Sequence, residues 1–429
     1  RKALRAREGD VASADVTAAT AQALRDYYGS RGYINTIVKP VLDATAATGT
    51  VDITFAIAEG ALTHIRNVAI RGNTRTRDKV IRREILVAPG DTYDEVKIRR
   101  SERILNNLGF FETVRSFPVA TRQEDEKDLV FQLEEKRTGN VMLGMGFSSV
   151  DNLMAFMDLQ QANFDIAGWP YFTGGGQKLK LHTQVGSTRK EYDLSFTEPW
   201  FLDRKLSLGF DIYRQERNYD DYDVKRTGAA ISLGKALPLA NRLDFRYRLE
   251  RTDLDDVSDT NEYVYVDSPE ESYFFTQEPR RLTESSLTVS LTHDDRDNPF
   301  VPTRGNRTSV FAGLTGGPLG FDADLYRLGI SAVQHVPLWY GHVLSVRTRW
   351  EAVDRYGSTE AVPIDDRLFI GGGRTIRGFE YRDVGPKVQR TYERDDGTAA
   401  TVHRPVGGAT LGLASAEYSI PIVSKVRLA

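Results

Sequence analysis

The sequence predicts two parts, α+β repeats of the order βααββ and then an all-β antiparallel barrel that crosses a membrane. Three observations predict this fold class. The order of elements occurs twice within the first third of the chain. The hydrophobic period then changes from helical spacing to strict alternation near residue 139. No apolar run approaches the ~18 residues that a membrane helix needs, whereas the strands of a transmembrane barrel hide their apolar face in alternation.

Composition is compatible with this prediction. The 429 residues are 40% hydrophobic, and the chain is too long for one ordinary domain. It has no cysteine, which excludes disulfides and thiolate metal sites, and its net charge of -3 gives no support for nucleic-acid binding. We predict no catalytic residues, cofactor or metal site. The glycine runs at 174–176 and 371–373 lack the Gly-Lys-Ser/Thr ending of a phosphate loop.

The complete copy of the repeat is residues 61–137. It opens with an alternating strand that stops at Gly72-Asn73. Thr76 is predicted to cap a short helix, and a capping box at 92–95 is predicted to begin a second, longer helix. Two further strands are expected to complete this module.

A partial copy of the same order lies at 1–60. A helix is expected at about 16–29 and a strand at 51–57. The first strand of this copy and most of its first helix are missing. Two unrelated small α+β modules are the alternative interpretation.

The order βααββ resembles the POTRA module, the periplasmic repeat that precedes the barrels of the outer-membrane barrel-assembly superfamily. Glycine at the end of the second helix suits a C-cap, and two phenylalanines follow it. The residues that carry the resemblance are Gly72, Asn73, Leu108, Gly109, Phe110 and Phe111.

From residue 139 onward apolar and polar residues alternate. We predict strands near 139–148, 153–163, 176–187, 190–199, 204–215, 224–237, 241–253, 283–294, 305–315, 323–336, 341–354, 408–420 and from 424. Alternation alone leaves a soluble β-sandwich open, because its strands alternate too. Rows of charge on one face favour a wide, wet lumen and a lipid-facing exterior.

A glycine-rich run, GGGRTIRGFEYRDVGP, occupies residues 371–386 and should fold back closely on other backbone. Its tetrad Ile376-Arg377-Gly378-Phe379 resembles the signature of the sixth extracellular loop in the same superfamily, and the segment that follows it best matches the BamA family. Further matches to that family lie at 197–201, 293–305 and 414–418. An ordinary glycine-rich hairpin with a solvated arginine is the alternative.

The resemblance implies that this loop lies inside the barrel lumen. Arg377 would then face Glu417, which shares a strand phase with Ser415 and so suits the lumen wall. We expect this ion pair to be partly desolvated and Phe379 to pack on the wall, while Gly378 lets the backbone press close. The alternative is that Arg377 meets only water or a carboxylate beyond the end of this sequence.

The resemblance also implies that the first barrel strand is a lateral gate that pairs weakly with the closing strand. Glycine weakens a strand interior and leaves few side chains to lock a partner. The residues are Gly139, Val141, Leu143, Gly144, Met145, Gly146 and Phe147. The alternative is that these glycines only accommodate the junction with the repeats.

By this resemblance the chain divides into a partial repeat at 1–60, a complete repeat at 61–137 and a barrel at 138–429. A family barrel has sixteen strands, so we expect a fragment that ends inside its thirteenth. The implied location is the cell outer membrane, with the repeats in the periplasm. The implied function is the folding and insertion of β-barrel proteins by strand templating, without nucleotide.

The expected partners are unfolded outer-membrane β-barrel substrates, outer-membrane lipids and accessory assembly lipoproteins, with no nucleic acid. A TamA-like or two-partner secretion transporter of the same superfamily is the alternative function. A passive porin is a third, and it would need no POTRA-like repeats.

Overall fold

The computed structural model describes residues 9–45, 49–148, 152–219, 222–257, 262–373, 375–394, 397–423 and 426–428. It divides into two compact units, residues 1–140 with 161–177 and residues 141–160 with 178–429. The first eight residues of the partial repeat and Ala429 lie outside the described part. Among the described residues, no helix is both long and apolar enough to span a membrane.

The partial repeat contains α1 (Ala14–Gly29), β1 (Ile37–Thr45) and β2 (Thr50–Ala58), and the two strands form an antiparallel sheet. The predicted helix and the second strand are confirmed. The sequence did not predict β1, because Lys39-Pro40 interrupts its alternation. Proline is tolerated in β1 because, among the described strands, β1 pairs on one side only.

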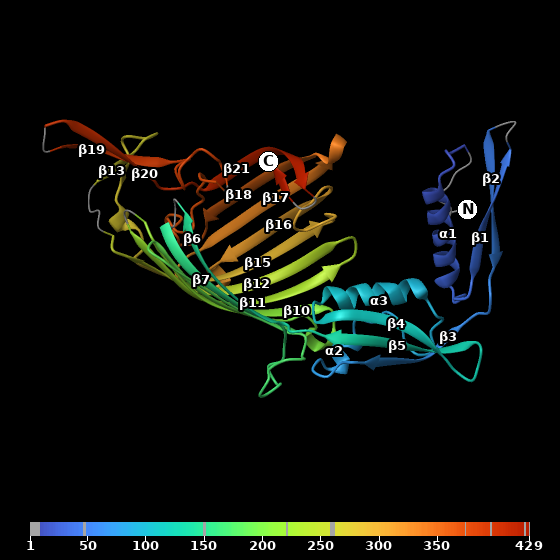
Figure 1. Ribbon diagram of the computed structural model, residues 1–429. Helices are drawn as coiled ribbons and strands as arrows, with labels where there is room; N and C mark the ends of the chain where they lie inside the picture. The colour runs from blue at the N-terminus through green and yellow to red at the C-terminus, as the bar shows by residue number, and fades with distance from the viewer. Residues whose placement is uncertain are drawn as a thin grey trace. The chain divides into compact units, whose positions relative to one another are not determined.

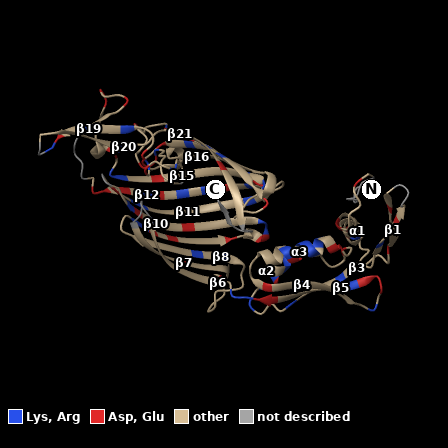
Figure 2. Ribbon diagram, turned by 45° about the horizontal axis from the view of Figure 1, so that its top comes forward, with Lys and Arg blue, Asp and Glu red and all other residues tan. Residues whose placement is uncertain are grey.

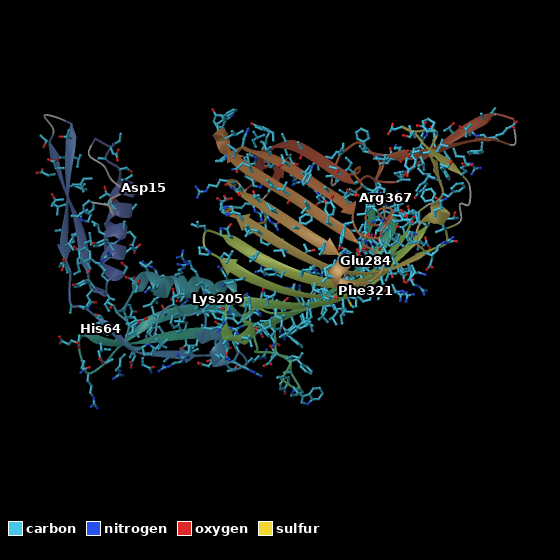
Figure 3. All side chains as sticks on the ribbon, turned by 180° about the vertical axis from the view of Figure 1, so that it is seen from behind. Asp15, His64, Lys205, Glu284, Phe321 and Arg367 are labelled. Atoms are coloured by element: carbon cyan, nitrogen blue, oxygen red, sulfur yellow. The ribbon has the colours of Figure 1, made fainter. Side chains whose placement is uncertain are left out.

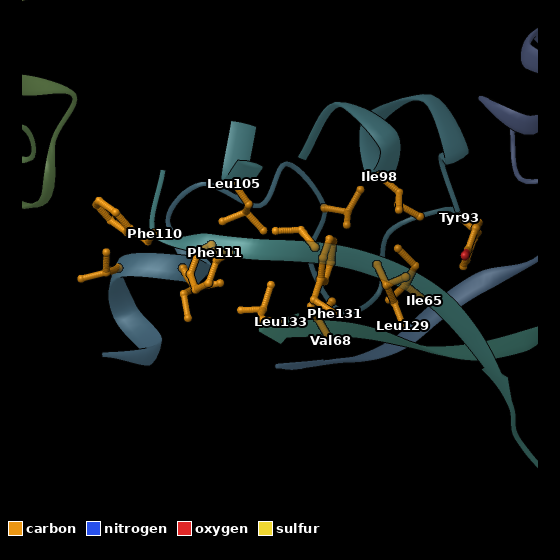
Figure 4. Packing of buried hydrophobic residues seen from close by; sticks show 14 residues of the cluster. Ile65, Val68, Tyr93, Ile98, Leu105, Phe110, Phe111, Leu129, Phe131 and Leu133 are labelled. Atoms are coloured by element: carbon orange, nitrogen blue, oxygen red, sulfur yellow. The ribbon is translucent and has the colours of Figure 1, made fainter. Parts of the chain in front are cut away.

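The complete repeat has the predicted order βααββ. Its elements are β3 (His64–Arg71), α2 (Asp78–Arg82), α3 (Glu95–Asn107), β4 (Phe111–Ala120) and β5 (Glu126–Glu135). The sheet order is β3-β5-β4, with β5 parallel to β3 and antiparallel to β4. A hydrophobic core joins the sheet to the helices (Figure 4), and its most buried members are Ile65, Ile81, Leu105, Leu129 and Phe131.

Both predicted helix caps in this module are wrong. Asp94, and not the capping box that opens at Thr92, caps α3, because its Oδ1 accepts a hydrogen bond from Lys97 N at 2.9 Å. Thr76 does not cap α2, which begins two residues later without a side-chain cap. The backbone of Thr76 instead donates to Glu135 Oε1 at 2.7 Å, a contact between residues 59 positions apart.

Two glycines of the repeat are required by its backbone. Gly109 has φ +74° directly after Leu108, the C-cap residue of α3, which is the position where glycine commonly ends a helix. Gly72 has φ +90°, and a Cβ added there would lie 1.9 Å from the carbonyl oxygen of Leu133. Asn73 beside it donates from Nδ2 to the carbonyl oxygen of Thr76 at 3.2 Å.

In the described part of the chain, thirteen strands form one antiparallel sheet in which sequence neighbours pair in order (Figure 1). They are β6 (Gly139–Ser148), β7 (Asn152–Phe164), β8 (Gln177–Gly186), β9 (Arg189–Glu198), β10 (Leu206–Asn218), β11 (Asp223–Leu237), β12 (Asn241–Asp255), β15 (Arg281–Asp294), β16 (Gly305–Thr315), β17 (Leu325–Pro337), β18 (Val343–Arg355), β21 (Thr410–Val423) and β22 (Val426–Leu428). The predicted strands are therefore confirmed. Over the described residues the sheet is open, with β6 and β22 at its two edges.

The two faces of this sheet differ in chemistry. Charged side chains are distributed along its strands (Figure 2), and some pair across the sheet, such as Arg246 with Asp211 at 2.9 Å. On the opposite face of β10, Phe210 and Ile212 are 41% and 61% exposed. Apolar side chains that stay uncovered on one face suit contact with lipid.

The segment 161–177, which joins β7 to β8, belongs to the same compact unit as the repeats. Asn163 is buried and donates from Nδ2 to Thr76 Oγ1 at 2.9 Å. The backbone of Arg77 donates to the carbonyl oxygen of Gly174 at 3.0 Å. A Cβ at Gly174 would lie 2.1 Å from a carbonyl oxygen of the repeat, so this close backbone approach requires glycine.

A second sheet forms from the long connections of the large one. Its strands are β13 (Tyr263–Tyr265), β14 (Ser272–Tyr273), β19 (Lys387–Glu393) and β20 (Ala399–Pro405), in the order β14-β13-β19-β20. Its core includes Tyr222, Tyr263, Phe275, Ile364, Val388 and Val406. The sequence did not predict this sheet, because its strands are short and pair across segments far apart in the chain.

Candidate functional site

The glycine-rich run lies between β18 and β21 and folds back on its own backbone. Gly371 has φ +124°, and a Cβ added there would lie 2.3 Å from the carbonyl oxygen of Glu380. Gly372 N donates to the carbonyl oxygen of Phe379 at 3.1 Å. Only glycine fits at position 371, because both the backbone angle and the space exclude a side chain.

Arg377 and Glu417 form an ion pair in the structure. Arg377 Nη2 lies 2.9 Å from Glu417 Oε2. The two side chains are 71% and 42% exposed, so the expectation of a partly desolvated pair is wrong for this chain. An exposed pair of this kind contributes about 0–1 kcal/mol.

The neighbours of Arg377 also differ from the expectation. Phe379 is 55% exposed and does not pack into the wall. Gly378 has φ +89°, but apart from its two chain neighbours no heavy atom of the described residues lies within 4 Å of a Cβ built there. This glycine is therefore needed for the turn and not for a close approach. Ile376 is half-buried.

The strand register places Glu417 on a charged face of the sheet. Glu417 pairs with Ser345 of β18, and Ser415 pairs with Arg347. Directly opposed residues of an antiparallel pair share a face. Tyr418 points to the other face and is 42% exposed. Alternation along the strand predicted that Glu417 and Ser415 share one face of the sheet, and the register shows the same arrangement.

Three consecutive residues at the base of the loop form ion pairs that the sequence did not indicate. Asp365 accepts from Arg226 of β11, with Nε 2.6 Å from Oδ2. Asp366 accepts from Arg327 of β17 at 3.0 Å, and Arg367 donates to Glu278 at 2.8 Å. The base of the loop is thus tied to two strands and to a second long connection.

Glu278 is the most enclosed of these partners. The side chains of Arg367 and Glu278 are 14% and 8% exposed. Glu278 Oε1 also accepts from the Tyr273 hydroxyl at 2.9 Å, and its Oε2 accepts from Ile364 N at 3.0 Å. This carboxylate therefore links the loop base to the β13–β14 segment through three donors.

The far arm of the loop is held by an arginine between aromatic rings. The guanidinium carbon of Arg382 lies 3.3 Å from the ring centre of Phe369 and 4.5 Å from that of Tyr219. The guanidinium carbon of Arg217 lies 4.6 Å from the ring centre of Tyr381. Cation–π contacts of this geometry stabilise a loop that carries few buried apolar side chains.

A polar cavity of about 610 Å³ lies against the loop base. Its lining includes Lys180, Asp211, Arg246, Arg248, Glu250 and Asp366. Within the described ranges, no group of three or more His, Asp or Glu side chains is arranged to hold a metal ion. Charges of both signs line the cavity, which suits a water-filled lumen.

The first strand presents a strongly exposed apolar face. Val141, Leu143, Met145 and Phe147 are 60%, 73%, 79% and 77% exposed. Gly144 has a packing role that the sequence did not show, since a Cβ there would lie 2.3 Å from Phe156 Cζ of β7. Gly146 is less restricted, with Met154 Cγ 3.8 Å away, and Gly139 faces Gln161.

Comparisons with known proteins cover nearly the whole chain. The Omp85 superfamily domain matches residues 172–429, and the POTRA family, described as a surface antigen variable number repeat, matches 1–60 and 63–136. The outer membrane protein assembly factor BamA of Nitratidesulfovibrio vulgaris is 28% identical over 404 residues, 94% of this chain and 47% of the relative. BamA of Neisseria meningitidis is 26% identical over 389 residues, 86% of this chain and 46% of the relative.

The fold has a close counterpart among solved structures. The crystal structure of BamA from Haemophilus ducreyi lacking POTRA domains 1-3 aligns with a TM-score of 0.72 at 23% identity, over 98% of this chain and 79% of that one. The present chain spans about half the length of the two BamA relatives. The matches locate the sheet in the outer membrane and the repeats in the periplasm. The chain belongs to the Omp85 superfamily.

Proposed function

We propose that this chain is part of a BamA-like outer-membrane protein assembly factor, which folds and inserts β-barrel proteins into the outer membrane. The observation that carries the proposal is the match of nearly the whole chain, repeats and sheet together, to outer membrane protein assembly factors. The role needs no catalytic centre or nucleotide. The free energy comes from strand pairing and from burial of apolar side chains in lipid.

The first strand, β6, is the proposed site of strand templating. It lies at one edge of the sheet, so one row of its backbone groups is open to a further strand. An incoming segment adds by backbone hydrogen bonds, which tolerate many substrate sequences. Leu143 and Met145 leave their outward face apolar, which suits a pairing site that opens toward lipid.

The loop that carries Arg377 is proposed to act as a lumen plug that steadies the wall at β21. The pair of Arg377 with Glu417 connects the loop tip to β21. The ion pairs of Asp365, Asp366 and Arg367 support the same role from the base. Such a plug keeps the lumen wall in one arrangement while the edge strands exchange partners.

The repeats are proposed to hold substrates in transit. Among the described strands, β4 pairs with β5 alone; Ser116 N donates to Glu102 Oε1 at 2.6 Å, and the rest of the outer edge has no strand partner. Phe117 and Val119 near the end of β4 are 41% and 38% exposed. An extended chain can add to such an edge. Accessory assembly lipoproteins are proposed to dock on the same modules, and the boundaries 1–60, 61–137 and 138–429 remain predictions.

A cross-linking experiment in the full-length protein tests the gate. A disulfide between Met142→Cys on β6 and a cysteine on the last barrel strand should block assembly of a β-barrel substrate and leave the fold intact. The control is Ser309→Cys with Ser331→Cys, which joins two strands that are already paired, and it should assemble normally. Normal assembly by the gate-linked protein would refute the proposal and favour a secretion transporter of the same superfamily.

A further inference from the structure

Three short turns of the large sheet share one backbone conformation. They join β9 to β10, β11 to β12 and β17 to β18, and all lie at the end of the sheet where β6 begins. In each turn both central residues have positive φ. The closing hydrogen bonds run from Arg204 N to Phe201 O at 3.2 Å, from Asn241 N to Pro238 O at 3.4 Å and from His342 N to Trp339 O at 3.1 Å. Positive φ at both centres is the requirement of a type I′ turn, which favours Asn-Gly.

The first central position of each turn is instead apolar. Leu202, Leu239 and Tyr340 have φ of 55°, 58° and 54°. A bulky side chain is disfavoured at such angles, because its Cβ crowds the backbone. These side chains are also 71%, 84% and 87% exposed, so each carries a second unfavourable feature if the turn faces water. Two unfavourable features at the same position of three turns indicate that the side chain itself is needed.

The longer turn between β15 and β16 presents one more apolar tip. Phe300 is 92% exposed. Asn298 Oδ1 accepts from the backbone N–H groups of Phe300 at 2.8 Å and Val301 at 3.1 Å, and Asp297 Oδ1 accepts from Thr303 N at 2.9 Å. The backbone donors beside this tip are therefore satisfied inside the turn. A segment that enters the edge of a bilayer has this requirement, since few waters remain to bond them.

We propose that Leu202, Leu239, Phe300 and Tyr340, here called the turn anchor, insert into the interface of the periplasmic phospholipid leaflet. This end of the sheet is the periplasmic one, because the periplasmic repeats lead directly into β6. The anchor requires only the membrane location of the chain. It does not depend on the proposed assembly function.

A lipid surface fits the turn anchor better than a protein partner does. The four tips are single side chains spread along successive turns, and lipid-facing strand surfaces such as Phe210 and Ile212 continue from them. Lys205 follows one tip, with its Nζ 5.2 Å from the ring centre of Trp200. Figure 3 shows Lys205 at the opposite end of the sheet from Phe321 and Arg367. An ammonium group beside an indole suits a phosphate headgroup above the acyl chains.

Depth measurements test the turn anchor in full-length protein reconstituted into vesicles of phosphatidylethanolamine and phosphatidylglycerol. Leu239→Cys and Tyr340→Cys each receive a fluorophore, and the vesicles carry a lipid with a nitroxide near its headgroup. Both fluorophores should be quenched, whereas one at Glu270→Cys in an exposed long connection should not. Equal quenching at all three positions would overturn the proposal. Shielding from soluble iodide without lipid quenching would also overturn it, because a protein would then cover the tips.

A second experiment separates the anchor from the turn conformation. Leu202→Asn, Leu239→Asn and Tyr340→Asn together supply the residue type that positive φ favours and remove the apolar tips. This triple variant should unfold from the vesicles at lower urea than the wild type. The matched control, Ala240→Asn, places Asn at a second centre and keeps the tips, so its midpoint should not fall. A triple variant as stable as the control would refute the anchor.

Discussion

The loop between β18 and β21 is expected to depend more on its buried base than on its exposed tip. The perturbation is Arg367→Ala, compared with Arg377→Ala. Arg367 is 14% exposed and donates to Glu278, which is 8% exposed. Arg377 is 71% exposed and donates to Glu417, which is 42% exposed.

The two arginines differ in what their removal leaves behind. Arg367→Ala leaves the Glu278 carboxylate enclosed without a cation, and removing one partner of a buried pair costs about 3–5 kcal/mol. Arg367 also donates from Nε to Val362 O at 2.8 Å, a bond that alanine cannot replace. Arg377→Ala leaves Glu417 in contact with water and costs about 0–1 kcal/mol. A difference of at least ~2 kcal/mol corresponds to about a 30-fold larger opening constant for the Arg367 variant.

Native-state hydrogen exchange of residues 364–386 in the reconstituted full-length protein measures this opening directly. Arg281→Ala, which removes another exposed arginine that pairs with Asp253, is the control and should leave the loop unchanged. Arg367→Ala combined with Glu278→Ala should be less severe than the sum of the single effects, because the stranded charge is gone. Equal or greater exchange in Arg377→Ala than in Arg367→Ala would refute the reasoning.

Three further outcomes are expected. Glu135 lies in the periplasmic repeat; burial opposes its ionisation, but hydrogen bonds from the Thr74, Arg75 and Thr76 segment hold the pKa of its carboxyl below the ordinary 4.5. The ionised carboxyl therefore contributes its full stabilisation above pH 4.5 and loses it as the pH falls through the lower pKa of the folded state. Glu135→Gln should weaken the fall of the unfolding temperature at acid pH. Gly371→Ala should expose the loop to protease, since alanine is strained at φ +124° and meets Glu380 O at 2.3 Å. Its control is Gly373→Ala, where a Cβ meets no described atom within 4 Å beyond the chain neighbours. Asn163→Leu leaves Thr76 Oγ1 and Gly176 N without that partner and should lower the free energy of unfolding of the repeat unit by about 1–3 kcal/mol in urea titration; an unchanged midpoint would contradict this account.

The sequence by itself determined the order of modules and the strands of the large sheet. Alternation is a local property of each segment, and a strand with one lipid-facing side must repeat every second residue. For this reason the predicted strands agree with the observed ones to within a few residues. The phase of Glu417 followed from the same period, without knowledge of its neighbours.

Only the tertiary structure decided which distant groups meet. Asp94 caps α3 in place of the predicted residue, and Glu135 accepts a hydrogen bond from the backbone of Thr76, 59 residues away. The loop base pairs with Arg226, 139 positions away along the chain, so no spacing rule indicates it. Such contacts depend on how the sheet brings strands together. The local sequence around a charged residue does not indicate whether its partner is water or a buried carboxylate. The short β13, β14, β19 and β20 form a sheet only because the long strands bring their connections side by side.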